Sequence, residues 1–425
     1  MILQVLSLSG YRISELPNSL GDLKHLRYLN FSYTLIKWLP ESVCYLYNLQ
    51  TLILRGCKSL FKLPIGIGNL INLRHLDLID TDELQEMPSQ ICKLGSLQTL
   101  SKFIVSKGSG LRIRDLGNLT QLLGKLSILG LQNMVNMKEA MDANLKNRHK
   151  IEDLTVELGY VDAQNETLTE MLEPHQNLKK LTVQWYWGFK FPSWIGDRSF
   201  SSMVQLSLSD CRNCRTLPPL GRLTSLKVLH ISSMYKVGRV DDAFYGEVST
   251  SFKPFPSLES LTFGNMPNWE FWFPLSNSDA EVQTLFPSLV ELKISQCPLL
   301  HCELIHPCLH SIVKLDVREC PHTLLRFEFP FLRELNVTDI MGLRRGLHID
   351  LHSLNALTKL RIEAIPELAR IGEWLPLELE YWETYNCASL EELPKGFKRL
   401  KSLKELRIGH CPNLVSFPET GLPPR

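Results

Sequence analysis

The sequence predicts an α/β solenoid in which short strands and return segments are stacked unit upon unit. Two observations support this prediction. The pattern L-x-x-L-x-L recurs from one end of the 425-residue chain to the other, and most successive copies begin 20 to 27 residues apart. That spacing accommodates one strand and one return segment per unit. Clear copies begin at Leu3, Leu26, Leu49, Leu73, Leu126, Ile151, Leu178, Met203, Leu226, Leu258, Leu289, Ile312, Leu332, Leu357 and Leu403, and degraded copies begin at Leu97 and Leu379.

Each copy predicts a short strand whose alternate residues point inward. The apolar face of one unit stays open until the next unit covers it, so about seventeen units form one continuous core. We therefore expect a leucine-rich-repeat solenoid, shaped as a horseshoe, with a parallel sheet on its concave face. Short helices and irregular returns, such as the segment LPNSLGDLKHL, are expected on the convex face.

Three longer spacings, of 29, 32 and 31 residues, interrupt the regular pattern. They predict regular repeats at 1–100, a linker or irregular repeat at 101–125, and irregular repeats at 126–425 with loops near 233–257 and 264–288. The polar stretches SKGSGLRIRD and FPLSNSDAEVQTLFP lie in these intervals. Long loops on a rigid scaffold often carry function, so we expect both stretches to protrude from the solenoid.

Composition argues against several classes of partner. The 46 Lys and Arg residues against 45 Asp and Glu residues leave a formal charge of +1, so no overall field attracts nucleic acid or an anionic membrane. No run approaches the roughly eighteen apolar residues of a membrane span, and the first residues lack the pattern of a signal peptide. Eleven scattered cysteines fit reduced thiols better than a secreted disulfide framework. The sequence thus predicts a cytoplasmic protein.

Six of the eleven cysteines occupy one position of the repeat, three residues after the last inward residue of a strand. The chain turns inward there as the strand bends into the return segment, and a small polar side chain can bond backbone that is otherwise unpaired. We therefore expect a structural role for this set, which consists of Cys57, Cys211, Cys297, Cys320, Cys387 and Cys411.

Two cysteine arrangements raise the alternative of a metal site. Cys211 and Cys214 form C-x-x-C, but no second such pair lies at zinc-finger spacing. The segment from Cys297 to His322 holds four cysteines and four histidines, yet two of those cysteines are already explained as repeat residues. The sequence therefore predicts no metal and no cofactor.

No pattern of catalytic residues emerges from the sequence. The segment GNLTQLLGKLS comes nearest to a phosphate-binding loop, but six residues instead of four separate its glycines. Leu126 stands where a magnesium-binding Ser or Thr belongs, and the same leucine opens a repeat strand. The sequence contains no nucleophile-elbow, zinc-protease or kinase pattern. We therefore predict that the chain is not an enzyme.

The first four units resemble a particular family. The phrase VLSLSGYRISELPNSLGDLKHLRYLNFSYTLIKWLPESV, with its continuation to LRHLDL, looks like the leucine-rich-repeat region of plant coiled-coil nucleotide-binding disease-resistance proteins, the RPP-like group of NLR immune receptors. The stretch LQTLSKFIVSKGSGLRIRDLGNLTQLLGKLSILGLQNM is similar to the linker that interrupts the solenoid of that family. The family's receptors carry coiled-coil and nucleotide-binding domains before this point, so a truncated product or a fragment is expected here.

The resemblance implies two protein-binding roles. Early repeats would hold a nucleotide-binding switch domain, in the same chain or another, in its resting state. Later repeats would bind a pathogen effector or a guarded host protein. The switch-domain candidates are the outward residues Arg27, Tyr28, Arg55, Arg74 and His75, for which a merely solvated face is the alternative. The recognition candidates are Trp185, Tyr186, Trp187, Lys314, Arg318, Arg333, Arg361, Tyr381 and Arg407.

Two alternatives accompany these assignments. At least one of the three clustered aromatics is expected to face outward, as interface anchors do, and core packing is the competing explanation for the cluster. The whole chain could instead be an extracellular leucine-rich-repeat receptor or inhibitor ectodomain. Its return segments, however, read L-P where the secreted plant type has G-x-I-P.

Overall fold

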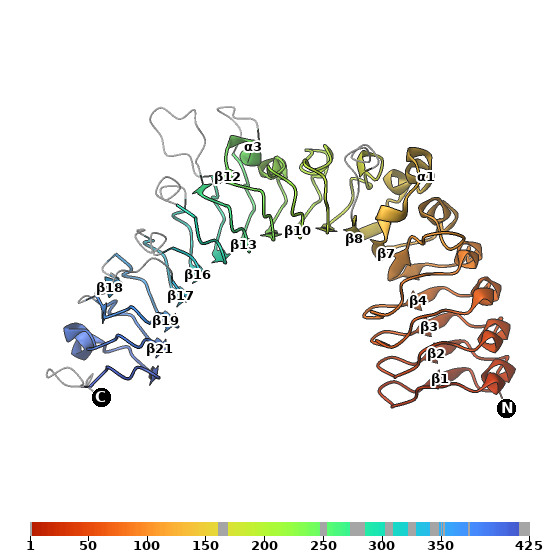
Figure 1. Ribbon diagram of the computed structural model, residues 1–425, viewed down its shortest axis with the longest axis horizontal. Coiled ribbons are helices and arrows are strands. Elements are labelled where there is room, and N and C mark those ends of the chain that lie inside the picture. The colour runs from red at the N-terminus through yellow and green to blue at the C-terminus, as the bar shows by residue number, and fades with distance from the viewer. Residues whose placement is uncertain are drawn as a thin grey trace. The chain divides into compact units, whose positions relative to one another are not determined.

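The structure of the chain is a computed structural model (Figure 1). It describes residues 2–159, 169–246, 253–272, 285–301, 309–321, 329–340, 348–349, 351, 353–372 and 375–415. The chain divides into two compact units. Unit 1 comprises Met1–Gly188, Pro192–Trp194 and Ser199–Met203, and unit 2 comprises Phe189–Phe191, Ile195–Arg198 and Val204–Arg425. Each unit is a solenoid of strands and return segments, as the repeat pattern predicts.

Unit 1 begins with a parallel sheet whose five strands follow one another in chain order. The inward leucines Leu29, Leu52 and Leu76 are at most 1% exposed, so consecutive repeats share one core. Figure 1 shows these strands on one side of the unit and short helices on the other. The strands are β1 (Val5–Ser7), β2 (Tyr28–Asn30), β3 (Thr51–Ile53), β4 (His75–Asp77) and β5 (Thr99–Leu100).

Proline starts each helix on the return side of these repeats. The prolines of the L-P and M-P pairs precede 3-10 helices, and their φ angles lie between −73° and −62°. The proline ring fixes φ near this value, so the residue is already set for the helical turn that follows. The helices are η1 (Asn18–Asp22), η2 (Glu41–Tyr45), η3 (Ile65–Asn69) and η4 (Ser89–Lys93).

The sheet of unit 1 is interrupted at Ser101, between β5 and a second set of strands. The second set pairs in the order β9-β8-β7-β6. Its strands are β6 (Lys102–Ile104), β7 (Gly124–Leu129), β8 (Ile151–Glu157) and β9 (Lys180–Gln184). Its helices are η5 (Ile113–Asn118), η6 (Leu131–Asn133), α1 (Met137–Asp142) and η7 (Leu145–Asn147).

The stretch at 106–115 does not protrude as predicted. Residues 107–109 and Arg114 are exposed, whereas Leu111 and Ile113 are fully buried. Arg112 explains the difference, because its guanidinium pairs with Glu139 of α1 at 2.9 Å and holds the stretch against the repeat. A segment that looks polar in the sequence is therefore part of the folded unit.

Unit 2 is a solenoid with longer strands and an irregular return side. Its main sheet contains β10 (Gln205–Ser209), β11 (Val228–Ser232), β13 (Ser260–Gly264), β15 (Glu291–Ser295), β16 (Lys314–Arg318), β17 (Glu334–Thr338), β19 (Lys359–Glu363), β21 (Tyr381–Tyr385) and β22 (Glu405–Gly409). Its other elements are η9 (Leu220–Arg222), β12 (Arg239–Val240), α3 (Asp242–Tyr245), β14 (Phe271–Trp272), β18 (His348–Ile349), β20 (Arg370–Ile371) and η12 (Lys395–Arg399).

Aromatic side chains fill the interior where the repeats of unit 2 are longest. Phe255 stacks on Phe286 with ring centroids 5.3 Å apart, and the indole of Trp272 donates a hydrogen bond of 2.9 Å to the hydroxyl of Tyr245. The described parts of the two predicted loops therefore include ordered structure, namely β12, α3 and β14. The polar stretch predicted to protrude at 273–287 lies mostly outside the described residues.

The cysteines at the repeat position play the structural role that their spacing predicts. The thiols of Cys211, Cys297 and Cys320 each donate to the carbonyl two residues earlier, over 3.1 to 3.3 Å. Cys57 instead donates to the carbonyl of Phe31 in the preceding repeat at 3.0 Å. The residue just before each of these cysteines has a positive φ, for example 54° at Gln296. The chain thus turns sharply inward there, and the thiol satisfies a carbonyl at the strand end.

The described residues include no group of three His, Cys, Asp or Glu side chains that could hold a metal ion. Cys302, His306, Cys308 and His322 lie outside the described residues, so the segment considered for a metal site is described only in part. No helix in the described part of the chain is long and apolar enough to cross a membrane.

Candidate functional site

The parallel strands of unit 2 pair in register, so side chains at equal positions form three rows on the exposed face of the sheet. Row one consists of Gln205, Val228, Ser260, Glu291, Lys314, Glu334, Lys359, Tyr381 and Glu405. Row two consists of Ser207, His230, Thr262, Lys293, Asp316, Asn336, Arg361, Glu383 and Arg407. Row three consists of Ser209, Ser232, Gly264, Ser295, Arg318, Thr338, Glu363, Tyr385 and Gly409.

From β15 to β22 the three rows carry equal numbers of opposite charges. The six cations are Lys293, Lys314, Arg318, Lys359, Arg361 and Arg407, and the six anions are Glu291, Asp316, Glu334, Glu363, Glu383 and Glu405. Because the two sets cancel, this part of the face has no net charge at neutral pH. We call it the charged face.

Ion pairs run both along and across the strands of the charged face. The carboxylate of Glu334 lies 3.2 Å from the ammonium of Lys314 and 2.9 Å from that of Lys359. The guanidinium of Arg361 lies 2.9 Å from the carboxylate of Glu363 on its own strand and 3.6 Å from that of Glu383 on the next. Each charge thus has an internal partner that a bound protein must displace or share.

Hydrogen bonds from the neighbouring lysines shift the ionisation of these carboxylates. The pKa of Glu334 lies below its ordinary value, chiefly because Lys359 donates to the carboxylate and also because Lys314 does. The pKa of Glu291 is lowered in the same way, chiefly by Lys293. Both carboxylates therefore stay charged to lower pH than usual, and the pairs persist under mildly acidic conditions.

From β10 to β13 the same rows are small and uncharged. They carry mainly Ser, Thr and Gly side chains, together with the half-buried His230 and the partly exposed Val228. Burial lowers the pKa of His230, because the charged imidazolium is poorly solvated there. The exposed face of unit 2 thus consists of a neutral part followed by the charged face.

Most recognition candidates in unit 2 lie on this face. Lys314, Arg318, Arg361, Tyr381 and Arg407 occupy the three rows of the charged face. The phenol of Tyr381 donates to Glu383 at 2.7 Å, and the guanidinium of Arg407 lies 5.9 Å from the Tyr381 ring centroid. Arg333 is exposed one position before β17, beside the rows. The structure therefore brings the basic and aromatic candidates together, although their roles remain predictions.

The aromatic cluster at 185–187 divides between the surface and the core. Trp185 is 39% exposed and Trp187 is partly exposed, whereas Tyr186 is 1% exposed. Tyr186 cannot present its ring to a partner, and its place in the repeat explains why. It lies three residues after Val183, at the position that cysteine holds elsewhere, and its ring covers Gly188. Applying the cysteine spacing rule to this repeat would have predicted its burial.

The switch-domain candidates of unit 1, which we call the basic strip, are not all free of internal partners. Arg27 and Arg74 are exposed, and Tyr28 and His75 lie partly exposed beside them on the exposed face. Arg55, however, pairs with Asp77 of β4 at 2.9 Å.

The acidic partners of the charged face were missed among the site residues, and the repeat alignment contained the signal for them. Glu334, Glu383 and Glu405 occupy outward positions of the L-x-L core, like the basic residues that were identified. Placing neighbouring repeats in register would have exposed the alternation of charge.

Parallel strands, inward leucines and a face of mixed charge define the chain as a leucine-rich-repeat solenoid suited to binding protein. Comparison with known proteins supports the same fold. Residues 113–234 match the family model described as R13L1/DRL21 LRRs. The solved structure of the leucine-rich-repeat protein LIC12759 of Leptospira interrogans superposes with a TM-score of 0.51 at 21% sequence identity, covering 96% of this chain and 85% of that one. The predicted fold is thereby confirmed.

The chain fits the leucine-rich-repeat region of plant disease resistance proteins, as its resemblance implied. Disease resistance RPP13-like protein 1 of Arabidopsis thaliana is 37% identical over 443 aligned positions, which cover 100% of this chain and 40% of that protein. Disease resistance protein At3g14460 of the same plant is 43% identical over 335 positions, which cover 75% of this chain and 23% of that protein. The chain therefore spans less than half the length of these relatives.

Proposed function

We propose that this chain is the protein-interaction module of a plant intracellular immune receptor and acts by binding. The charged face of unit 2 is the observation that carries the proposal. Its cations and anions alternate, whereas a phosphate-binding face would carry cations in excess. A face of this kind selects a protein surface by matching its pattern of charge. The naming of the relatives as disease resistance proteins supports a receptor of plant defence.

The mechanism we propose is differential contact with two partners. A nucleotide-binding switch domain contacts the exposed face of unit 1 through Arg27 and Arg74, which stabilises the resting state. A pathogen effector or a guarded host protein contacts the charged face of unit 2. Binding of that second partner favours the state in which the switch domain is released, and the size of the effect equals the difference in its affinity for the two states.

Charge reversal on unit 1 tests the first contact. A switch domain from a related disease resistance protein is co-expressed with the chain, and the amount recovered in a pull-down is measured. We expect Arg27→Glu with Arg74→Glu to lower recovery about tenfold or more, since two cationic contacts become repulsive. Arg12→Glu, at another exposed position of unit 1, is the matched control. Unchanged recovery with the double variant would show that Arg27 and Arg74 do not contact the switch domain.

Charge reversal on unit 2 tests the second contact. Arg361→Glu is compared with Lys398→Glu, which lies on η12 of the return side. In a plant cell-death assay with a matching effector, we expect Arg361→Glu to abolish the response and Lys398→Glu to preserve it. If both variants respond like the natural chain, the charged face does not recognise the activating partner.

A further inference from the structure

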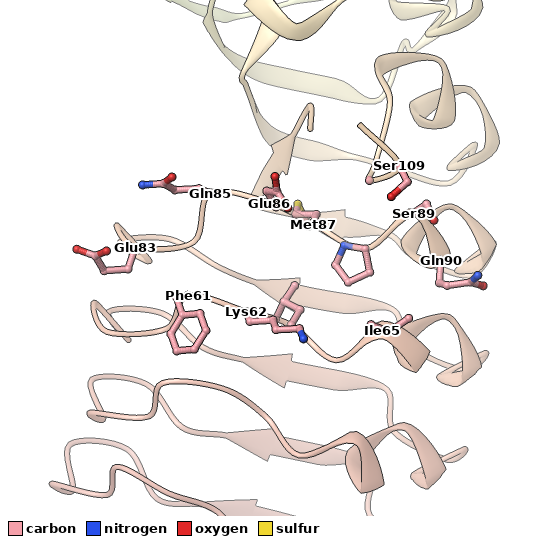
Figure 2. A pocket seen from close by; sticks show the side chains of 13 residues that line it. Phe61, Lys62, Ile65, Glu83, Gln85, Glu86, Met87, Ser89, Gln90 and Ser109 are labelled. Carbon is pink, nitrogen blue, oxygen red and sulfur yellow. The ribbon is translucent and has the colours of Figure 1, made fainter. Parts of the chain in front are cut away.

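A groove opens between consecutive return segments of unit 1. Its volume is about 760 Å³, within the range of ligand-binding sites. One wall is the return segment at 61–65, the other is the segment at 83–90, and Ser109 and Gly110 close one end. Figure 2 shows Phe61, Lys62 and Ile65 on one segment and Glu83, Glu86 and Met87 on the neighbouring segment.

The groove lies where the periodic pairing of the return segments stops. Trp38 and Lys62 occupy the same position of consecutive repeats and form a parallel β-bridge. The equivalent residue one repeat later is Glu86, which the structure places in no bridge. Lys62 therefore has a strand-like neighbour on one side and the groove on the other. An extended chain has an edge to pair with there, as in peptide recognition by strand addition.

The walls of the groove combine apolar surface with carboxylates. Phe61 is 51% exposed and Ile65 is 61% exposed, and Leu63 and Met87 lie beneath them in the core. The edge-on contact between Phe61 and Trp38, with centroids 6.1 Å apart, extends the apolar surface along the preceding repeat. Large aliphatic side chains of a partner would bury this surface.

The charges at the rim select the remaining side chains of the partner. Glu83 and Glu86 line the groove, and neither forms an ion pair with another residue that the structure describes. Lys62 is the single cation among the lining residues. The rim thus has a net charge of −1, from one lysine and two glutamates, and both carboxylates are available to a basic ligand.

We infer that this groove binds an extended segment of a protein partner in which aliphatic and basic residues alternate. In a strand, alternate side chains point to opposite faces. The aliphatic side chains would enter between Phe61 and Met87, while the lysines or arginines would reach Glu83 and Glu86. This surface is separate from the rows of strands β15 to β22, so the inference does not rest on the function proposed for them.

Defined peptides test the inference on the full chain. Fluorescein-labelled KLKVK is titrated with protein and followed by fluorescence anisotropy, beside ELEVE and the block peptide KKKLV. We expect KLKVK to bind at least about tenfold more tightly than either of the others, since only it presents both chemistries in the alternating order. Equal binding of KKKLV would show non-specific charge attraction, and equal binding of ELEVE would exclude the carboxylates as ligands.

Variants of the groove identify the site. Glu83→Gln with Glu86→Gln should weaken KLKVK binding about three- to tenfold, which is the expected effect of losing two rim charges. Glu15→Gln is the matched control, because Glu15 holds the position of Glu86 in the first repeat. Ser109→Tyr, which fills the end of the groove from an exposed position, should weaken binding of KLKVK without lowering the melting temperature.

Three results would overturn the inference. The first is an unchanged affinity for KLKVK in both the glutamine double variant and the tyrosine variant. The second is an equal loss of affinity in the Glu15→Gln control. The third is a concentration-dependent dimer in sedimentation velocity that disappears in the Ser109→Tyr variant, because the groove would then be occupied by a second copy of this chain.

Discussion

Breaking the ion pair between Arg112 and Glu139 should release the segment at 101–125 from unit 1. The side chains are only 15% and 9% exposed, and one guanidinium nitrogen of Arg112 donates to both carboxylate oxygens, at 3.1 Å and 2.9 Å. Arg112→Met removes the cation and leaves the carboxylate of Glu139 buried without its partner. Glu139→Met leaves the guanidinium of Arg112 buried without its partner.

The size of the effect follows from the burial of the pair. Removing one member of a buried ion pair typically costs 3–5 kcal/mol, while replacing both members by apolar residues is often neutral, so we expect about 3 kcal/mol or more for each single variant. At roughly 1.4 kcal/mol per factor of ten, local opening becomes about 150-fold more frequent. The double variant Arg112→Met with Glu139→Met should recover most of the loss.

Hydrogen exchange followed by mass spectrometry measures this opening where it occurs. Peptides that cover 101–145 should exchange faster in either single variant, until exchange is limited by opening of the whole unit. Peptides that cover 28–77 should be unchanged and serve as the internal control. The reasoning is refuted if the single variants exchange within about threefold of the natural chain, or if the double variant is no better than the singles.

Three further predictions concern stability. Glu334→Gln should lower the free energy of unfolding by about 0.5–1 kcal/mol at neutral pH and leave it unchanged in strong acid. The reason is that Lys359 depresses the folded-state pKa of Glu334, so the stabilisation is lost as the pH falls through that value. Melting temperatures measured across the pH range check this. Arg148→Ala should cost about 2–4 kcal/mol in urea unfolding, since the guanidinium donates to the carbonyls of Leu116, Leu119 and Ala143, whereas Arg148→Lys should recover only part of the loss. Gly56→Ala should cost more than about 1 kcal/mol, because φ is +70° and the added methyl would meet the ring of Tyr33, and thermal melts that overlay would contradict this.

The repeat pattern predicts the fold in detail because each unit repeats the same local physics. An inward leucine every second residue fixes the face of each strand, and the offset from the last inward residue predicts the buried position of Cys57. The same rule predicts that Tyr186 is buried, as the structure shows, although its position between two tryptophans suggested a surface residue. At such a position the neighbouring residue types give a wrong prediction of burial, whereas the position within the repeat gives the right one.

Other features depend on contacts between repeats that differ in sequence. The polar stretch around Arg112 becomes part of the core only because Glu139, 27 residues later, supplies a buried counter-charge. The groove beside Phe61 exists because the pairing of return segments ends between Lys62 and Glu86. No periodicity within the sequence encodes either arrangement, since each depends on one long-range partner. Only the folded structure brings such partners together.

The charged face imposes a condition on how recognition there could change. Arg361 forms ion pairs with both Glu363 and Glu383. Arg361→Glu therefore removes two attractions and creates two repulsions within the free protein. Exchanging Arg361→Glu with Glu383→Arg instead preserves the net charge and one cross-strand pair while reversing the pattern that a partner meets. We therefore expect the exchange to keep the melting temperature within about 2 °C of the natural value, in line with the small worth of exposed pairs, but to abolish binding of the activating partner. A loss of both stability and binding would show that the ion pairs of the charged face stabilise the fold. A loss of neither would show that the activating partner does not contact the charged face.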